Sequence, residues 1–472
     1  MTLSPEQRSA VEAQGQDVCV VAGPGSGKTR VLTHRFEWLV ERGVEPQRIL
    51  AITFTEKAAT EIKKRLVDTF QSRPAVRRLI ERAYVSTVHG FCARLLREHA
   101  ITAGVDPEFS VLDENAAAAI RAKVIEEVLD ELCRGRPAEM RSLLENLYVS
   151  SQPGTKQPDL SVALDEIYEA MRIAGVPPAE ARSMEGERPP GNLSTVTAPL
   201  AAVLHGAAGA TEPQRRQLGL LREWLARAPT DTAPGPDHFE WLAAFPGNLR
   251  GLPPAVRDVV RELREEGIPA VESSLISAAN VPLYDFLIEI LEAIDSNYSY
   301  SKLVSGGLDF NDLEERAISL LRDDPATREQ IASCFDHILM DELQDTNPLQ
   351  WTLIELLRRP RAFFAVGDIN QSIFGFRHAE PRVFRRYRSS LSDAGNRVHE
   401  LRGNHRSRGE ILAAVNAVFR SVEGVEPHTL VPEAEYPPKT EPSVEVLVAA
   451  GANLEEALRR EAEWIAARIL EL

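Results

Sequence analysis

The chain has 472 residues, 43% hydrophobic and 26% charged, which is typical of folded domains and, at roughly 150 residues per domain, predicts about three of them. Its 54 basic and 70 acidic residues give a net charge of −16, which excludes a protein that coats nucleic acid with a uniformly basic surface but not one that grips it in a local groove. No apolar run is expected to approach the roughly 20 residues that span a bilayer, and the N-terminus lacks a secretory signal, so we predict a cytoplasmic protein without a membrane segment.

The first 113 residues alternate between short apolar runs and helical patterns. Strands are expected at residues 17–22, 48–54 and 84–87, each followed by a helix, at 29–40, 56–66 and about 90–99. Because continuous apolar runs are typical of strands that are buried on both faces, this alternation predicts an α/β fold with a parallel sheet.

The pattern then changes to helices and later returns to strands. From about residue 114 to 300 helical spacing dominates, which predicts a helical insertion; buried strands resume at 337–341 and 362–366. A strand at 444–448 and a helix at 455–472 close the chain, so we expect its last domain to be incomplete. The predicted domains are 1–113 and 301–395 for the two parts of the first α/β domain, 114–300 for the insertion, and 396–472 for the start of a second α/β domain.

The four cysteines are scattered and form no CxxC pair: Cys19, Cys92, Cys133 and Cys334. In a cytosolic protein this pattern predicts reduced core side chains rather than a disulfide framework or a zinc site. The function is therefore sought in other motifs.

A glycine-rich turn between the first expected strand and helix predicts a nucleotide site. In this turn, backbone N–H groups can cradle phosphates at a helix N-terminus, Lys28 can reach the β- and γ-phosphates, and the Thr29 hydroxyl can bind Mg²⁺. A chance glycine-rich turn is the alternative, which the strand before it and the helix after it disfavour. Ala22 stands where the general pattern has glycine, and a small residue still fits there. The turn consists of Ala22, Gly23, Pro24, Gly25, Ser26, Gly27, Lys28 and Thr29.

Two carboxylates follow the strand expected at 337–341. Because the carboxyl ends of parallel strands lie at one edge of a sheet, Asp341 and Glu342 are expected beside the phosphate loop. Asp341 is placed to hold Mg²⁺, and Glu342 to polarise the water that attacks the γ-phosphate. An isolated Asp-Glu pair would be interpreted as two solvated loop acids, but with the upstream loop that becomes the minor interpretation.

Seven segments resemble, in the order of the family, motifs of the UvrD/Rep-like superfamily 1 DNA helicases. The segment Asp341–Asn347 resembles the DExQD(T) motif, which narrows the choice among nucleotide-binding families. The large insertion favours the AddA/RecB side of the family. The resemblance covers roughly residues 3–113 and 308–472, and the insertion matches by position only. The other segments are Leu3–Gln7 (the Q motif), Thr53–Ala59 (motif Ia), Ser86–Phe91 (motif Ib), Leu308–Leu313, Gly367–Arg377 (motif III) and Asn404–Ser407 (motif IV).

The resemblance implies roles for five residues around ATP. Gln7 would contact the adenine, and His405, which stands where the family usually has an aromatic residue, would stack on it. Arg30 would lie on the other face of the base. Arg377 and Arg406 would stabilise charge at the γ-phosphate; a surface salt bridge is the alternative for either arginine.

The resemblance also implies a DNA site coupled to ATP. Gln371 would link the γ-phosphate to DNA, since it lies three residues before Phe374. Phe374 and Phe376 would offer rings on which bases stack, each worth roughly 1–3 kcal/mol, with core packing as the alternative. For His89, local capping or packing is the alternative to contact with DNA. The residues that would contact the DNA backbone or bases are Thr55, Thr87 and His89.

Together the motifs predict a RecA-like, ATP- and Mg²⁺-dependent DNA helicase of repair or recombination, stimulated by single-stranded DNA and moving 3′ to 5′. The expected partners are single-stranded DNA, its junctions with duplex, and a helicase–nuclease partner subunit. No counterparts of motifs V and VI or of a nuclease segment are found, so the chain is expected to stop inside the second motor domain. The alternative is an ATP- and DNA-binding module that hydrolyses little without a partner or the missing region. An unrelated P-loop kinase or NTPase explains Lys28 and Asp341 but not Phe374 and Phe376.

Overall fold

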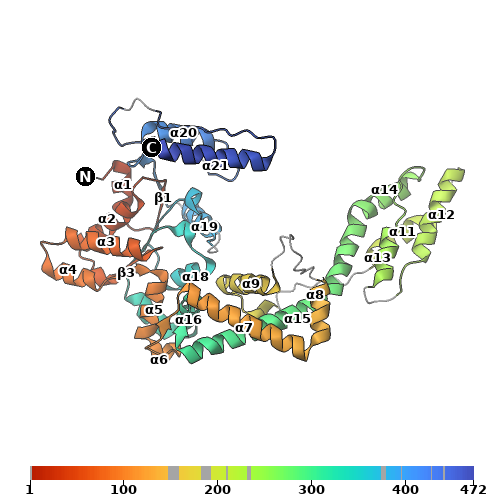
Figure 1. Cartoon of the computed structure of the whole chain (residues 1–472), viewed down its shortest axis with the longest axis horizontal. Coiled ribbons are helices and arrows are strands. Elements are labelled where there is room, and N and C mark those ends of the chain that lie inside the picture. Colours follow the sequence, from red (N-terminus) through yellow and green to blue (C-terminus); the bar gives the residue numbers. More distant parts are fainter. Residues whose placement is uncertain are drawn as a thin grey trace. The chain divides into compact units, whose positions relative to one another are not determined.

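The computed structural model describes residues 3–146, 159–181, 193–208, 211–230, 235–373, 379–394, 396–426, 428–438 and 442–471 (Figure 1). Internal contacts divide the chain into two units. Unit 1 comprises Met1–Leu112, Ile173–Gly175 and Gly306–Leu472, and unit 2 comprises Asp113–Arg172 and Val176–Ser305.

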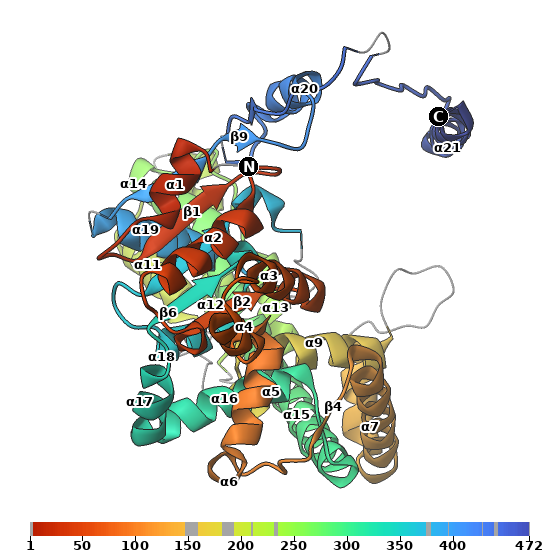
Figure 2. The same ribbon diagram turned by 90° about the vertical axis from the view of Figure 1, so that its left-hand side faces the viewer.

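A six-stranded parallel sheet in the order β3-β2-β6-β7-β1-β8 forms the centre of unit 1 (Figure 2). It confirms the predicted α/β fold with a parallel sheet. All the carboxyl ends of these strands therefore lie at one edge, which is where ligands bind in such sheets. The strands are β1 (Val18–Ala22), β2 (Ile49–Thr53), β3 (Tyr84–Thr87), β6 (His337–Met340), β7 (Phe363–Gly367) and β8 (Val398–Leu401).

Helices cover both faces of this sheet because its strands are apolar on both sides. In β1, Cys19 belongs to one hydrophobic core and Val18 and Val20 to the other, as the alternation of side chains along a strand requires. The second core receives the first four helices: α1 (Pro5–Val11), α2 (Lys28–Glu41), α3 (Glu56–Thr69) and α4 (Pro74–Glu81). The first core receives α5 (Val88–Glu98), α16 (Phe310–Asp323), α17 (Pro325–Ser333), α18 (Pro348–Leu357) and α19 (Pro381–Asp393).

Short elements connect these parts of unit 1. A two-stranded parallel pair, β4 (Ser110–Val111) and β5 (Gly307–Leu308), joins the two stretches of chain that flank the insertion. A second parallel pair is formed by β9 (Gly403–Asn404) and β10 (Val431–Pro432). The remaining short helical elements are η1 (Pro46–Arg48), α6 (Ala100–Ala103), η3 (Leu343–Asp345) and η4 (Ile369–Gln371).

Two expectations for the C-terminal part are wrong. Residues 398–401, assigned above to a second domain, form β8 and pair with β1, so they belong to the first sheet. The strand expected at 444–448 does not form: these residues have no regular secondary structure, and Val446 is 83% exposed. An extended segment becomes a strand only when a neighbour satisfies its backbone groups, and no described segment pairs with this one. The last expected helix is confirmed as α21 (Leu454–Glu471), after α20 (Gly409–Phe419).

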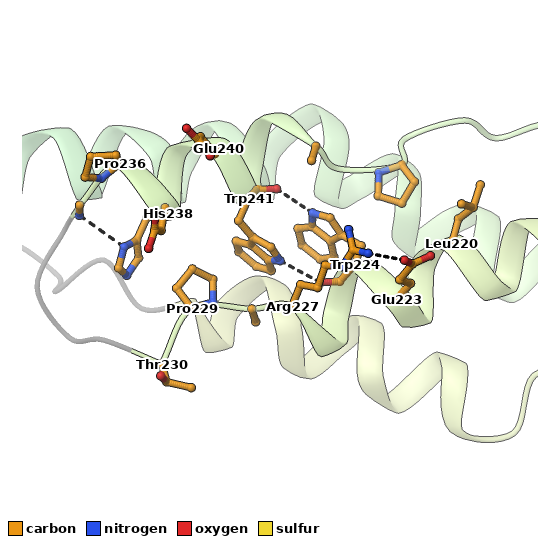
Figure 3. Close-up of a pocket in the computed structure, with 15 residues that line it drawn as sticks. Leu220, Glu223, Trp224, Arg227, Pro229, Thr230, Pro236, His238, Glu240 and Trp241 are labelled. Atoms are coloured by element: carbon orange, nitrogen blue, oxygen red, sulfur yellow. Dashed lines mark hydrogen bonds and ion pairs between the residues drawn. The ribbon is translucent and has the colours of Figure 1, made fainter.

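Described residues of unit 2 are helical, as predicted, and they form two hydrophobic cores. In one core Trp224 and Trp241 stack with ring centroids 4.0 Å apart, and each indole N–H donates to the other residue's backbone carbonyl (Figure 3). This pair lines a cavity of about 810 Å³ between α12 and α13. The helices are α7 (Glu114–Gly135), α8 (Pro137–Asn146), α9 (Leu160–Ala174), α10 (Pro178–Ala181), α11 (Ser194–His205), α12 (Glu212–Ala226), α13 (Pro236–Ala243), α14 (Pro254–Glu262), the π-helical η2 (Leu263–Gly267) and α15 (Ile268–Ser305).

The run from α14 to α15 bears on the membrane prediction. It is long and apolar enough to cross a membrane by length and composition, although 28% of its most apolar window is buried. The expectation that no run approaches this length is therefore wrong by that measure, because charges as sparse as Glu272, Asp285 and Glu289 leave the average apolar. Val271 and Ile294 of this run pack in the two cores of unit 2, which is how a long core helix passes the same test.

The cysteines divide into two classes. Cys19 and Cys92 are buried, whereas Cys133 and Cys334 are exposed. The prediction of core cysteines is therefore correct for the first two only. Burial raises the pKa of the Cys19 thiol to about 12, so this thiol stays protonated and unreactive.

Candidate active site

The phosphate loop joins the end of β1 to the start of α2, and its glycines are required by both backbone and space. Gly25 and Gly27 have φ values of 71° and 86°, in the left-handed region that favours glycine. A Cβ on Gly25 would lie 2.7 Å from Asn404 Nδ2. Asn404 approaches so closely because its Nδ2 donates to the backbone carbonyl of Pro24 at 2.6 Å. Motif IV is therefore fastened to the phosphate loop.

Gln7 supports the same loop from the N-terminal helix. It forms a capping box with Ser4 at the start of α1, and its Nε2 donates to the Ser26 carbonyl at 2.8 Å. Because Gln7 is only 2% exposed, the Q motif has a structural role in positioning the loop. The contact with adenine that the resemblance implies for Gln7 stays a prediction.

The side chains predicted to act on the phosphates lie together, although they come from distant segments. Lys28 Nζ lies 2.5 Å from Glu342 Oε2 and donates to Gln371 Oε1 at 2.9 Å. Thr29 Oγ1 donates to Asp341 Oδ2 at 3.2 Å. The parallel sheet causes this meeting, since β1, β6 and β7 all end at one edge. The arrangement is that of a cation and two carboxylates facing a phosphate-binding loop.

Glu342 adopts an unusual backbone conformation at this point. Its φ of 52° and ψ of 44° lie in the left-handed region, which a non-glycine residue rarely occupies. Such strain costs on the order of 1–3 kcal/mol and gathers at functional sites. Here it turns the chain directly after β6, so that consecutive carboxylates reach Thr29 and Lys28 respectively.

A buried amide that was not singled out from the sequence holds motifs II and III together. Gln344 Nε2 donates to Glu342 Oε2 at 2.8 Å and to Asp345 Oδ2 at 2.9 Å, while its Oε1 accepts from the backbone N–H of Asp368 at 2.8 Å. Asp368 in turn accepts from Gln371 Nε2 at 2.6 Å. A closed ring of hydrogen bonds thus fixes Glu342 relative to Gln371. The signal that could have found Gln344 is its place in the DExQD motif.

The carboxylate of Asp341 fits Mg²⁺. Burial, together with the charge of Glu342, raises the pKa of Asp341 to about 6, against the opposing effects of Lys28 and Thr29. A group that binds a proton this readily is one that a cation can stabilise. The hydroxyl and carboxylate oxygens of Thr29 and Asp341 are also the hard ligands that Mg²⁺ prefers.

Asp345 has a similarly unfavourable charge, which yields a test of the acid cluster. Burial and the charge of Glu342 raise the pKa of Asp345 to about 6 from an ordinary value of 3.8. A carboxyl whose folded-state pKa is raised stabilises the fold most below its unfolded pKa, and this contribution is lost as the pH rises through about 6.

We therefore expect Asp345→Asn to stabilise unit 1 progressively between about pH 4 and pH 7, with an upper bound of roughly 3 kcal/mol for this pKa difference. The measurement is the urea midpoint of both proteins across that range. A gain that is the same at every pH would show that Asp345 is not ionised at unusual cost.

Two of the predicted DNA contacts lie at the ends of β2 and β3, but only one faces solvent. Thr55 caps α3 by accepting from the Ala58 N–H, and it is exposed. The Thr87 hydroxyl is buried, accepts from the Gly90 N–H and donates to Glu56 Oε1 at 2.6 Å. The structure therefore uses the Thr87 side chain internally rather than offering it to a ligand.

His89 lies beside an aromatic ring that was not assigned a role from the sequence. Its imidazole stacks on Phe310, with ring centroids 4.5 Å apart and an interplanar angle of 27°. Phe310 is 38% exposed, so the pair presents flat aromatic surface to solvent. Phe310 lies in the Leu308–Leu313 segment quoted above, and that placement was the available signal.

The remaining predicted residues fall into two groups. Phe374, Phe376 and Arg377 lie outside the described residues. His405 and Arg406 are exposed, and the backbone N–H of His405 donates to the Gly25 carbonyl at 2.9 Å, so motif IV borders the phosphate loop. The third member of the adenine set, residue 30, lies in the first turn of α2, next to Gly27.

Comparison with known proteins places this geometry in a family. The model of the UvrD/REP helicase N-terminal domain matches residues 3–392. An ATP-dependent helicase/nuclease subunit of Alkaliphilus metalliredigens (strain QYMF) is 26% identical over 522 aligned residues, which cover 98% of this chain and 43% of that protein. The protein of the same name from Geobacillus thermodenitrificans (strain NG80-2) is 28% identical over 526 residues, covering 94% of this chain and 42% of that protein.

The chain thus spans less than half the length of these curated relatives. The family match extends through the phosphate loop, the acidic strand end and motif III. On this evidence, the chain belongs to the UvrD/REP helicase N-terminal domain family.

Proposed function

We propose that this chain is the ATP-binding motor portion of an ATP-dependent DNA helicase that acts in DNA repair or recombination. The single observation that carries the proposal is the cluster of Lys28, Glu342 and Gln371 at the mouth of the phosphate loop. Family membership and the relatives' name, which describes an ATP-dependent helicase/nuclease, support DNA as the substrate on which the motor works.

Each residue of the cluster has a task in hydrolysis. Lys28 exchanges its contacts with Glu342 and Gln371 for oxygens of the terminal phosphates. The freed Glu342 carboxylate then accepts a proton from the attacking water. Thr29 and Asp341 would hold Mg²⁺, which neutralises charge on the β- and γ-phosphates when it is bound. Arg406 supplies further positive charge from motif IV.

Single-stranded DNA is proposed to cross the ends of β2 and β3. Thr55 contacts its backbone, and bases stack on exposed rings, an interaction worth roughly 1–3 kcal/mol per base and independent of sequence. The stacked pair of His89 and Phe310 supports this path, and Phe374 and Phe376 extend it. A local aromatic path explains how a chain of net charge −16 binds DNA.

The finer features of the proposal are stimulation by single-stranded DNA, movement from 3′ to 5′, and work at junctions with duplex beside a helicase–nuclease partner subunit. They rest on the family and on the relatives' name. Partial duplexes with a single-stranded tail at one end test the direction: only the 3′-tailed substrate should be unwound.

Steady-state ATP hydrolysis with and without oligothymidylate tests the function. Turnover that rises with the oligonucleotide supports the motor. Binding of ATP and DNA without turnover would leave a binding module that needs a further segment or partner. Hydrolysis indifferent to DNA would contradict the proposal and favour an unrelated NTPase.

A further inference from the structure

Glu314 is a fully buried carboxylate in α16 that has no part in the site described above. Its side chain is 0% exposed, yet it lies near three side-chain nitrogens. Oε1 lies 2.9 Å from His89 Nε2 and accepts from Gln350 Nε2 at 2.7 Å, while Oε2 accepts from Asn347 Nδ2 at 3.4 Å. A buried carboxylate is costly unless its oxygens are paired in this way, so the three partners and Glu314 must move as a set.

Two of these partners are the capping box of α18. Asn347 Oδ1 accepts from the Gln350 backbone N–H at 2.8 Å, and Gln350 Oε1 accepts from the Asn347 N–H at 3.5 Å. Each amide side chain therefore uses its oxygen for the helix cap and its nitrogen for Glu314. The cap follows motif II directly, so Glu314 is joined to the end of the segment that carries the catalytic carboxylates.

The third partner connects Glu314 to the surface. The Asn347 and Gln350 residues are 7% and 8% exposed, whereas the His89 side chain is 33% exposed. His89 is also held by the ring of Phe310, which projects from the same helix as Glu314. A ligand that meets this stacked pair therefore acts on Glu314 through a single contact.

We propose that Glu314 is a positioning residue that transmits the binding of single-stranded DNA at His89 to the first turn of α18 and so to motif II. This inference rests on the DNA-binding function proposed above. A DNA phosphate draws the imidazole away from Oε1, and a buried acceptor that loses its partner costs roughly 1–3 kcal/mol. The carboxylate and the two capping amides rearrange to recover that loss, which shifts the start of α18.

Hydrogen exchange followed by mass spectrometry tests this link, with a short oligothymidylate as the probe. In the wild-type chain the oligonucleotide should change the exchange of the peptide that covers α18 (Pro348–Leu357). Glu314→Gln keeps the size of the side chain but replaces one acceptor oxygen with a donor, so it cannot accept from all three partners. This variant should still bind the oligonucleotide and should lose the change in α18.

Two further variants keep the test decisive. Gln350→Met cuts the same link on the side away from the DNA and should reproduce the effect, even if Glu314→Gln fails to fold. Asp323→Asn, an exposed position on the same helix, should behave as wild type.

Oligonucleotide binding to the wild type without a change in α18, or a change that persists in the folded variants, would overturn the role of Glu314 alone. Failure of the wild type to bind the oligonucleotide would instead overturn the proposed function on which this inference rests.

Discussion

Replacing Glu342 with glutamine is expected to lower ATP turnover by roughly 10²- to 10⁴-fold, the contribution typical of a general base, while ATP still binds. Glutamine keeps the size and can accept from Gln344 Nε2, which donates to Glu342 at 2.8 Å. It cannot take a proton from water. Single-turnover hydrolysis and the affinity for a fluorescent ATP analogue, measured on the same preparations, separate the two effects.

Glu329→Gln is the matched control, because this glutamate side chain is 80% exposed in α17 and its ion pair with Arg359, at 3.5 Å, lies outside the nucleotide site. The variant should turn over ATP as the wild type does. If Glu342→Gln hydrolyses ATP within about threefold of wild type, another group serves as the base and the assignment of Glu342 is wrong.

Lys28→Ala is expected to weaken nucleotide binding by roughly 10- to 100-fold, because charge-assisted hydrogen bonds contribute about 1.5–3 kcal/mol. The loss has a second cause. The charge of Lys28 lowers the pKa values of Asp341 and Asp345, so without it both carboxyls retain protons more readily and Asp341 becomes a poorer Mg²⁺ ligand. Titration with the fluorescent analogue at several Mg²⁺ concentrations measures both consequences.

Lys64→Ala, on the exposed side of α3, provides the control for loss of a lysine charge and should leave the affinity unchanged. Equal affinities for wild type and Lys28→Ala would mean that the phosphates bind elsewhere, and the phosphate-loop assignment would have to be abandoned.

The centre of the site was predictable from the sequence because its signals are local. The phosphate loop and the acids after β6 each lie at the end of an apolar run, and the parallel sheet that those runs predict brings the ends to one edge. Lys28 and Glu342 meet in this way although 314 residues separate them. The fold class followed from the same alternation of strands and helices.

Contacts that depend on long-range packing were not predictable. Nothing local in the sequence indicates that Asn404 donates to Pro24 or that Glu314 is buried beside His89. The use of the Thr87 hydroxyl by Glu56 likewise depends on how α3 lies beside β3.

Strand prediction failed in two opposite ways at the C-terminal part. β8, Val398–Leu401, contains His399 and Glu400 and so lacks the continuous apolar run of a buried strand, yet β1 pairs with it. Residues 444–448 have an apolar run but no pairing neighbour among the described residues. A strand is decided by its partner as much as by its own residues.

The central claim is that the nucleotide and single-stranded DNA sites of this chain are energetically linked. The most direct test is the dissociation constant of oligothymidylate measured with and without a non-hydrolysable ATP analogue, and the reciprocal measurement of the analogue with and without DNA. We expect the two ligands to change each other's affinity by the same factor, on the order of 5-fold or more. Affinities that are each unaffected by the other ligand would contradict the account.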